Sequence, residues 1–136
     1  MDFELKTGEQ LRTVLAVKDS ATVIEAGDLV ALDAGGEIIK ATAASTALAW
    51  CPNGAVAGTT EVEVTEGNEF TLKGTADANF AATNRGAIVD LVVTSEVQLI
   101  DLGASTTDVF QVSIAEDAGT VGSTADVEVR INNPIF

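Results

Sequence analysis

The sequence predicts an all-β protein, a sandwich or barrel of about ten short strands with at most one short helix. In residues 125–131 (ADVEVRI) apolar and polar residues alternate one by one. Successive side chains of a strand point to opposite faces, so this pattern is typical of a half-buried strand. Three apolar runs, at residues 88–93, 97–102 and 109–114, precede it and are separated by segments rich in Gly, Ser, Thr and Asp. Hydrophobic residues make up 46% of the chain, but aromatic residues only 4%, which suits the packing of sheet faces.

The N-terminal half begins with a polar segment and continues as short apolar runs between turns. Residues 1–11 lack periodicity and predict an extended N-terminal arm, so that residues 12–136 form a single β domain. Residues 12–17 and 21–24 predict two strands. A hairpin is expected from residues 29–32 to residues 37–41, because an Asp/Gly segment separates the two apolar runs.

The middle of the chain predicts a second hairpin and one helical turn. Residues 47–51 form a short apolar strand that stops at a Pro-Asn-Gly cluster. The alternating residues 61–65 should pair with residues 70–74 across the turn at 66–69. Residues 75–82 are the best candidate for a helical turn, with Thr75 as its N-cap.

The charge of the chain narrows its possible partners. Seven basic and 21 acidic residues among 136 give a net charge of −14, and the basic residues are scattered singly. Nucleic-acid binding needs clustered cations, and an anionic membrane would repel the chain, so we expect neither partner. A partner should instead present a basic or apolar surface.

The cysteine content and the N-terminal sequence suggest a reduced, unsecreted protein. Cys51 is the only cysteine, which excludes an intrachain disulfide and predicts a small buried side chain. The chain has no histidine to ionise a catalytic thiol. The acidic N-terminus lacks the pattern of a signal peptide, and no apolar run is long enough for a transmembrane helix.

No catalytic, cofactor-binding or metal-binding residues are expected. The Asp/Gly turns lack the alternating oxygen ligands of a calcium loop. The Gly-rich residues 118–124 lack the lysine and the following helix of a phosphate-binding loop. Acidic pairs such as Asp77 with Asp90, or Asp101 with Asp108, show nothing in the sequence that would separate their pKa values. Because Asp90 and Asp101 interrupt apolar runs, we expect each to face solvent or a partner subunit.

Apolar residues near the two chain ends are the candidate contacts with other subunits. Trp50 lies in a run of small residues and should belong to the core. Apolar side chains at loose chain ends either dock onto a neighbouring molecule or fold back onto their own subunit, and both alternatives stay open. The candidate contact residues are Phe3, Leu5, Ile135 and Phe136.

Two segments resemble a known family. Residues 21–41 (ATVIEAGDLVALDAGGEIIKA) and 62–73 (VEVTEGNEFTLK) are similar to the decoration, or cement, proteins that stabilise the heads of tailed bacteriophages. The shared pattern is an apolar run, a Gly-Asp turn and a second apolar run, followed later by Val-x-x-Gly-x-x-Phe-x-Leu. The C-terminal strand and residues 132–136 are not part of it.

The resemblance implies a small β-barrel or tulip-like β-sandwich that binds the outside of an icosahedral head as a homotrimer. The partner would be the major capsid protein, and the N-terminal arm would reach across the shell. The protein would be made in the host cytoplasm and become part of the virion, with no catalytic residue and no cofactor. The candidate contact residues would then touch the capsid or neighbouring subunits.

Other classes of function remain open from the sequence. The chain could be another virion component, such as a tail-tube or head-fibre protein, although no hairpin is long enough to suggest a tail tube. A non-catalytic binding module is a further alternative. Sugar binding is poorly supported, because it uses exposed aromatic side chains and this chain has one Trp and no Tyr.

Overall fold

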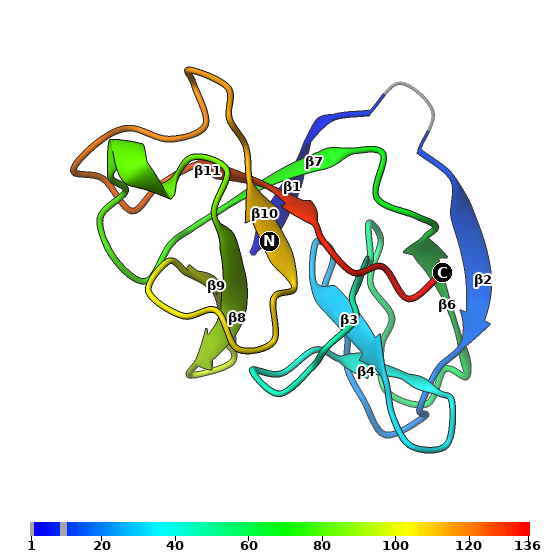
Figure 1. Ribbon diagram of the computed structural model, residues 1–136. Helices are drawn as coiled ribbons and strands as arrows, with labels where there is room; N and C mark the ends of the chain where they lie inside the picture. Colours follow the sequence, from blue (N-terminus) through cyan, green and yellow to red (C-terminus); the bar gives the residue numbers. More distant parts are fainter. Residues whose placement is uncertain (1, 9–10) are drawn as a thin grey trace.

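The computed structural model describes residues 2–8 and 11–136, and the prediction of an all-β fold is confirmed. The described residues form eleven strands and one 3-10 turn, arranged as in Figure 1. They do not form a closed barrel. The elements are β1 (Phe3–Thr7), β2 (Thr13–Val17), β3 (Leu29–Leu32), β4 (Ile38–Lys40), β5 (Ala49–Trp50), β6 (Glu61–Thr65), β7 (Thr71–Gly74), η1 (Ala82–Asn84), β8 (Ile88–Thr94), β9 (Val97–Asp101), β10 (Phe110–Val112) and β11 (Val127–Ile131).

A six-stranded antiparallel sheet occupies one side of the molecule, with the strand order β1-β7-β11-β10-β8-β9 (Figure 1). The alternation predicted for β11 places Val127, Val129 and Ile131 in the core beneath this sheet. Glu128, expected to face solvent, is also buried. The larger apolar cluster of the protein forms here because both ends of the chain supply strands to one sheet.

Two smaller sheets form the other side, β2-β6 and β4-β3-β5. The β3–β4 hairpin has the predicted pairing, with Leu32 opposite Ile38. A second, smaller apolar cluster lies between these sheets and includes Ile38, Val62 and Val64. Trp50 is buried in the larger cluster and Cys51 in the smaller one, as the sequence predicts.

The predicted second hairpin is wrong. β6 pairs with β2, whereas β7 pairs with β1 and β11 in the other sheet. The chain crosses between the two clusters at residues 66–70, because Val62 and Val64 pack in the smaller cluster and Leu72 in the larger one. The turn residues therefore marked the end of β6 and the start of β7 but did not specify the strand partners.

Two further local predictions differ from the structure. The strand expected at residues 21–24 is reduced to a single bridge between Ile24 and Ala55. The helical turn expected at residues 75–82 is wrong, because Ala76 bridges Ile100 and Phe80 is buried in the larger cluster. Only η1, which begins at the last residue of this segment, is helical among the described residues. None of these residues forms a helix long and apolar enough to cross a membrane.

The predicted N-terminal arm is instead a strand of the domain. Phe3–Thr7 forms β1, which pairs with β7 from Phe3 opposite Gly74 to Thr7 opposite Thr71. Apolar burial explains the difference, because the Phe3 ring packs within the larger cluster and stacks on Phe110 with ring centroids 5.6 Å apart. The prediction for residues 1, 9 and 10 lies outside the described residues.

One polar side chain joins the two sides of the molecule. Gln98 of β9 is completely buried, and its side-chain amide forms hydrogen bonds with the backbone of β3. Its Oε1 accepts from the Leu29 N–H at 2.8 Å, and its Nε2 donates to the Leu29 carbonyl at 2.8 Å and to the Ala41 carbonyl at 3.2 Å. Buried amides of this kind fix one relative position of the elements that they connect.

Candidate interaction surface

The four predicted contact residues differ in how far they are exposed to solvent. Phe3 is fully buried, so its prediction as a contact with another molecule is wrong and the alternative of folding back is correct. Leu5, two residues further along β1, is 37% exposed. Ile135 is half-buried against the smaller cluster, where its N–H donates to the Leu48 carbonyl. Phe136 is 46% exposed, so Leu5 and Phe136 are the two large accessible side chains of the set.

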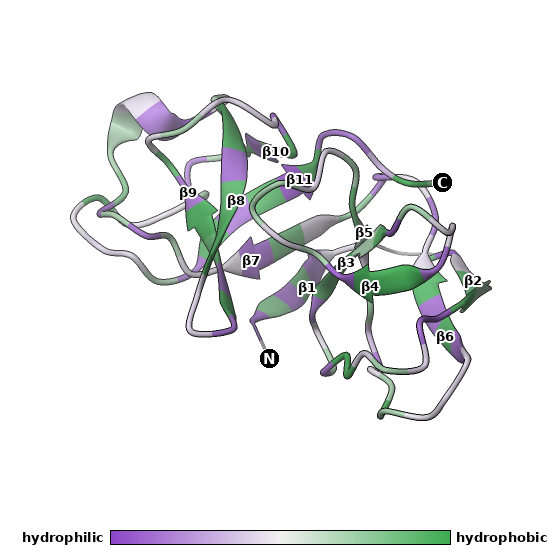
Figure 2. Cartoon of the chain, turned by 90° about the horizontal axis from the view of Figure 1, so that it is seen from below, coloured by the Kyte–Doolittle hydropathy of each residue, from purple (hydrophilic) through white to green (hydrophobic). Residues whose placement is uncertain are grey.

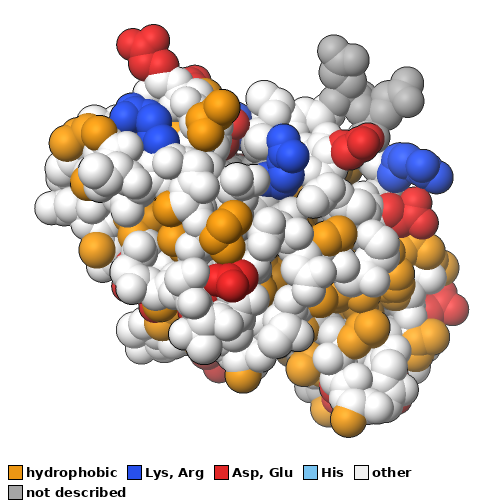
Figure 3. Space-filling model, viewed as in Figure 1, with side chains coloured by type: hydrophobic (Ala, Val, Ile, Leu, Met, Phe, Trp, Pro, Cys, Tyr) orange, Lys and Arg blue, Asp and Glu red, His pale blue; other side chains and the backbone are white. Residues whose placement is uncertain are grey.

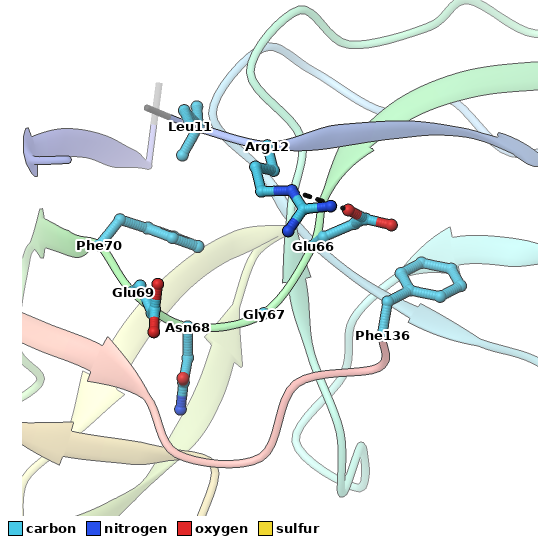
Figure 4. Close-up of a pocket in the computed structure, with 8 residues that line it drawn as sticks. All are labelled: Leu11, Arg12, Glu66, Gly67, Asn68, Glu69, Phe70 and Phe136. Atoms are coloured by element: carbon cyan, nitrogen blue, oxygen red, sulfur yellow. Dashed lines mark ion pairs between the residues drawn. The ribbon is translucent and has the colours of Figure 1, made fainter. Parts of the chain in front are cut away.

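An open groove of about 400 Å³ runs beside Phe136 (Figure 4). It lies where the chain crosses from β6 to β7, and Phe70 belongs to its wall. An ion pair between the Arg12 guanidinium and the Glu66 carboxylate, with atoms 3.6 Å apart, spans the groove in this view. The remaining lining residues are Leu11, Gly67, Asn68 and Glu69. The groove offers apolar side chains and one exposed ion pair, which suits contact with another polypeptide.

The β2–β6 ribbon has a second accessible surface. Its inner face carries the half-buried Val14 and Ala16 opposite Val64 and Val62. On the outer face, Leu15 and Val17 are 64% and 59% exposed. Their cross-strand neighbours are Glu63 and Glu61, respectively. We call these four outer residues, Leu15, Val17, Glu61 and Glu63, the ribbon face.

The figures show how the ribbon face is arranged. The alternation of apolar and acidic residues on β6 appears in Figure 2 as green and purple bands. Figure 3 shows orange and red side chains beside one another along the edge of the molecule where Figure 1 places β2 and β6. An apolar row therefore lies next to an acidic row on an exposed part of the molecule.

Asp90 does not face solvent or a partner as the sequence predicted, because its side chain is buried and anchors a loop. Its carboxylate accepts hydrogen bonds of 2.8 to 3.0 Å from the backbone N–H groups of Thr106, Thr107 and Asp108. Burial by itself raises the pKa of Asp90, but the hydrogen bonds from the three amides outweigh it. The pKa of Asp90 therefore lies below its usual value of 3.8.

We expect Asp90→Asn to destabilise the protein by about 2 kcal/mol at neutral pH, because hydrogen bonds to a charged acceptor are lost. A depressed folded-state pKa contributes stability that is present above the unfolded-state pKa and is lost as the pH falls through the folded-state pKa. The difference in unfolding free energy between wild type and variant should thus shrink below pH 3.8. Urea denaturation at several pH values measures it. A difference that stays constant from pH 6 to about pH 2.5 would contradict the assignment.

The structure pairs Asp77 with Asp101, whereas the pairs considered from the sequence were Asp77 with Asp90 and Asp101 with Asp108. Burial, and then the negative charge of Asp77, raise the pKa of the Asp101 carboxyl. Each carboxylate also accepts a backbone hydrogen bond, Asp101 from Gly103 and Asp77 from Leu102. Asp101 is half-buried at the end of β9, directly opposite Asp90 in β8. These bonds give the acidic pair a structural role in connecting the loops at this end of the sheet.

A partly buried ion pair was not predicted. The Lys6 ammonium lies 2.6 Å from the Glu128 carboxylate and 3.1 Å from that of Asp117. The hydrogen bond to Glu128 is the largest cause of the raised pKa of Lys6. The sequence placed Lys6 in a loose arm, so nothing indicated that it would cross the sheet from β1 to meet β11. The polar positions of an alternating strand had suggested only solvent exposure.

Cys51 and Asp28 are further buried ionisable groups. Burial raises the pKa of the Cys51 thiol and of the Asp28 carboxyl. Asp28 Oδ2 accepts from the Glu25 N–H and lies 3.5 Å from the Lys40 ammonium. No group of three or more potential metal ligands is found among the residues that the structure describes.

Comparison with known proteins adds no assignment. No protein family, curated protein or solved structure is significantly similar to the chain.

Proposed function

We propose that the chain is a structural protein of a bacteriophage virion, a decoration protein that binds the outer surface of the head as a homotrimer. The observation that carries this proposal is the resemblance of residues 21–41 and 62–73 to decoration proteins. In the fold, these segments contain the β3–β4 hairpin and the crossing from β6 to β7, next to the groove. The protein would bind the major capsid protein and stabilise its lattice.

The physical character of the molecule supports this proposal. Several of its exposed apolar side chains, among them Leu5, Leu15 and Val17, lie on strands, and Phe136 lies at the C-terminus, so they are accessible to a partner surface. Binding at many symmetric positions of a shell gives avidity that no single contact has. A net charge of −14 keeps free copies soluble before they meet the shell.

Two measurements test the proposal. Light scattering should give a mass three times the 13.9 kDa of the chain. Co-sedimentation with heads of the phage that encodes the chain should show saturable binding, with no binding to heads that are already decorated. A stable monomer that does not sediment with the heads would contradict the proposal and favour a non-catalytic binding module.

Leu5 and Phe136, the two accessible residues among the predicted contacts, can be tested by substitution in the co-sedimentation assay. We expect Leu5→Asp combined with Phe136→Asp to weaken head binding by about tenfold or more, because burying either carboxylate in an interface is costly. Ile114→Asp combined with Val121→Asp is the matched control, since these apolar residues are 81% and 63% exposed elsewhere on the surface. Equal head binding by the double variant and wild type, with the same oligomeric mass, would exclude these residues as contacts.

A further inference from the structure

The free edge of β2 differs from the two outer edges of the six-stranded sheet, those of β9 and β1. β9 is covered, because Gln98 donates its N–H to Asp2 Oδ2 and Ile100 donates to the Thr75 carbonyl. β1 donates the Phe3 N–H to the Gly27 carbonyl and carries charged residues. Proteins protect exposed edges by such loops and charges, since unpaired N–H and C=O groups invite another strand.

β2 has neither form of protection along its middle. Lys18 donates its N–H to the Thr60 carbonyl and Glu66 donates to the Arg12 carbonyl, so the even-numbered residues of β2 bond β6. The backbone groups of Thr13 and Leu15 therefore point away from β6, and the structure records no strand beside them in the described part of the chain. At the C-terminal end of the same edge, a bridge between Lys18 and Ile38 brings β4 alongside, so the free stretch of β2 ends before Lys18. The strand sequence, Thr-Val-Leu-Ala-Val, contains no charge, proline or glycine.

The charges beside this edge indicate the chemistry of its partner. The ribbon face places Glu63 next to Leu15 and Glu61 next to Val17. A second copy of the chain, with a net charge of −14, would bring further negative charge to this face. A cationic partner is favoured instead, because it would neutralise the two glutamates.

We propose that the free edge of β2 binds an extended segment of a partner protein in which basic and apolar residues alternate. The segment adds a strand to the β2–β6 ribbon by backbone hydrogen bonds to Thr13 and Leu15. Its Lys or Arg stems pack over Leu15 and Val17, and their charged ends reach the glutamates of β6. The distance to β6 is two strand spacings, roughly 10 Å, which a Lys or Arg and a Glu side chain together can span.

The apolar residues of the partner segment extend the inner face of the ribbon. They lie beside Val14 and Ala16, which are only half-buried although they pack on the smaller cluster. This alternation gives the added strand one apolar and one cationic side, so both faces of the ribbon contribute to recognition. The inference rests on the proposed function only for the partner's identity as a segment of the head shell.

Synthetic peptides test the inference on the purified protein. The probe is the blocked heptapeptide Lys-Val-Lys-Val-Lys-Val-Lys, and its control, Lys-Val-Lys-Pro-Lys-Val-Lys, has the same charge but cannot complete a strand. We expect the probe to bind about tenfold more tightly than the control and to slow hydrogen exchange of the Thr13 and Leu15 amides. Equal binding, or protection located elsewhere, would overturn the inference.

Two variants separate the backbone and charge contributions. Leu15→Pro removes an outward N–H without removing a bond to β6, and should abolish the preference for the probe. Glu61→Lys with Glu63→Lys should weaken binding of the probe and strengthen that of Glu-Val-Glu-Val-Glu-Val-Glu. Glu96→Lys with Glu116→Lys changes the net charge equally at exposed positions outside the ribbon, and should leave the preference unchanged. A loss as large in this control pair would reduce the effect to net charge and contradict the inference.

The remaining outcomes distinguish this inference from the proposed function. Protection of Thr13 and Leu15 that increases with protein concentration alone would identify a second copy as the occupant and overturn the inference. Peptide binding without head binding would contradict the proposed function and leave the edge site intact. Head binding that is unaffected by Leu15→Pro, in a folded variant, would contradict the edge site alone.

Discussion

Replacing Gln98 by Ala is expected to lower the free energy of unfolding by about 4 kcal/mol. The side chain bonds both backbone groups of Leu29 and the Ala41 carbonyl, and all of these partners lie in the interior. Their backbone groups would be left unpaired and away from water, and the truncation would also leave a cavity. Urea denaturation, followed by the fluorescence of Trp50, measures the loss.

Two further variants separate hydrogen bonding from packing at this position. Gln98→Met keeps most of the volume, so it should still cost at least about 2 kcal/mol. Gln111→Ala on β10, in the same sheet, is the control, because this half-buried side chain makes no hydrogen bond that the structure records. Its effect should stay within about 1 kcal/mol. Similar costs for Gln98→Ala and Gln111→Ala would show that Gln98 does not join the two sides of the molecule.

Phe3→Ala should destabilise the protein by about 4 kcal/mol, whereas Phe136→Ala should change its stability by less than about 0.5 kcal/mol. Phe3 is completely buried and stacks on Phe110, and Phe136 is 46% exposed. The contrast is informative because the sequence offered both phenylalanines as contacts with another molecule. Thermal and urea denaturation of the purified variants measure both effects.

The backbone around Phe3 makes this substitution a test of ring packing. The Trp50 indole N–H donates to the Phe3 carbonyl, a bond that truncating the side chain leaves in place. The Phe3 ring also covers Gly74, where an added Cβ would lie 2.5 Å from the ring. Phe3→Leu fills part of the space and should cost about half as much as Phe3→Ala. A stability of Phe3→Ala close to that of wild type would mean that β1 is detached from the sheet in solution.

Local patterns predicted strands well but their partners poorly. The alternation in β6 and β11 and the Asp/Gly turn between β3 and β4 are local properties, and all three elements form as expected. The pairing of β7 with β1 and β11 depends on which apolar cluster receives Leu72, and turn residues do not encode that choice. The sequence therefore predicted the fold class and several elements but not the division into three sheets.

The candidate site shows the same limit. Leu15 and Val17 belong to a run that was recognised as a strand, but their exposure depends on which face of the β2–β6 ribbon packs on the smaller cluster, a tertiary property. For polar residues within apolar runs the error is the reverse. Exposure was expected, but Asp90 and Glu128 are buried with specific partners. A count of charges could not reveal that Glu128 pairs with a lysine near the N-terminus, or that three loop amides donate hydrogen bonds to Asp90.

We propose that this molecule strengthens a shell by binding to its surface. The most direct test heats DNA-filled heads that lack the protein, with and without saturating amounts of the purified chain, and follows DNA release with a fluorescent dye. We expect DNA release to shift to a higher temperature, in proportion to the occupancy of the heads. An unchanged release temperature on fully occupied heads would contradict this proposal.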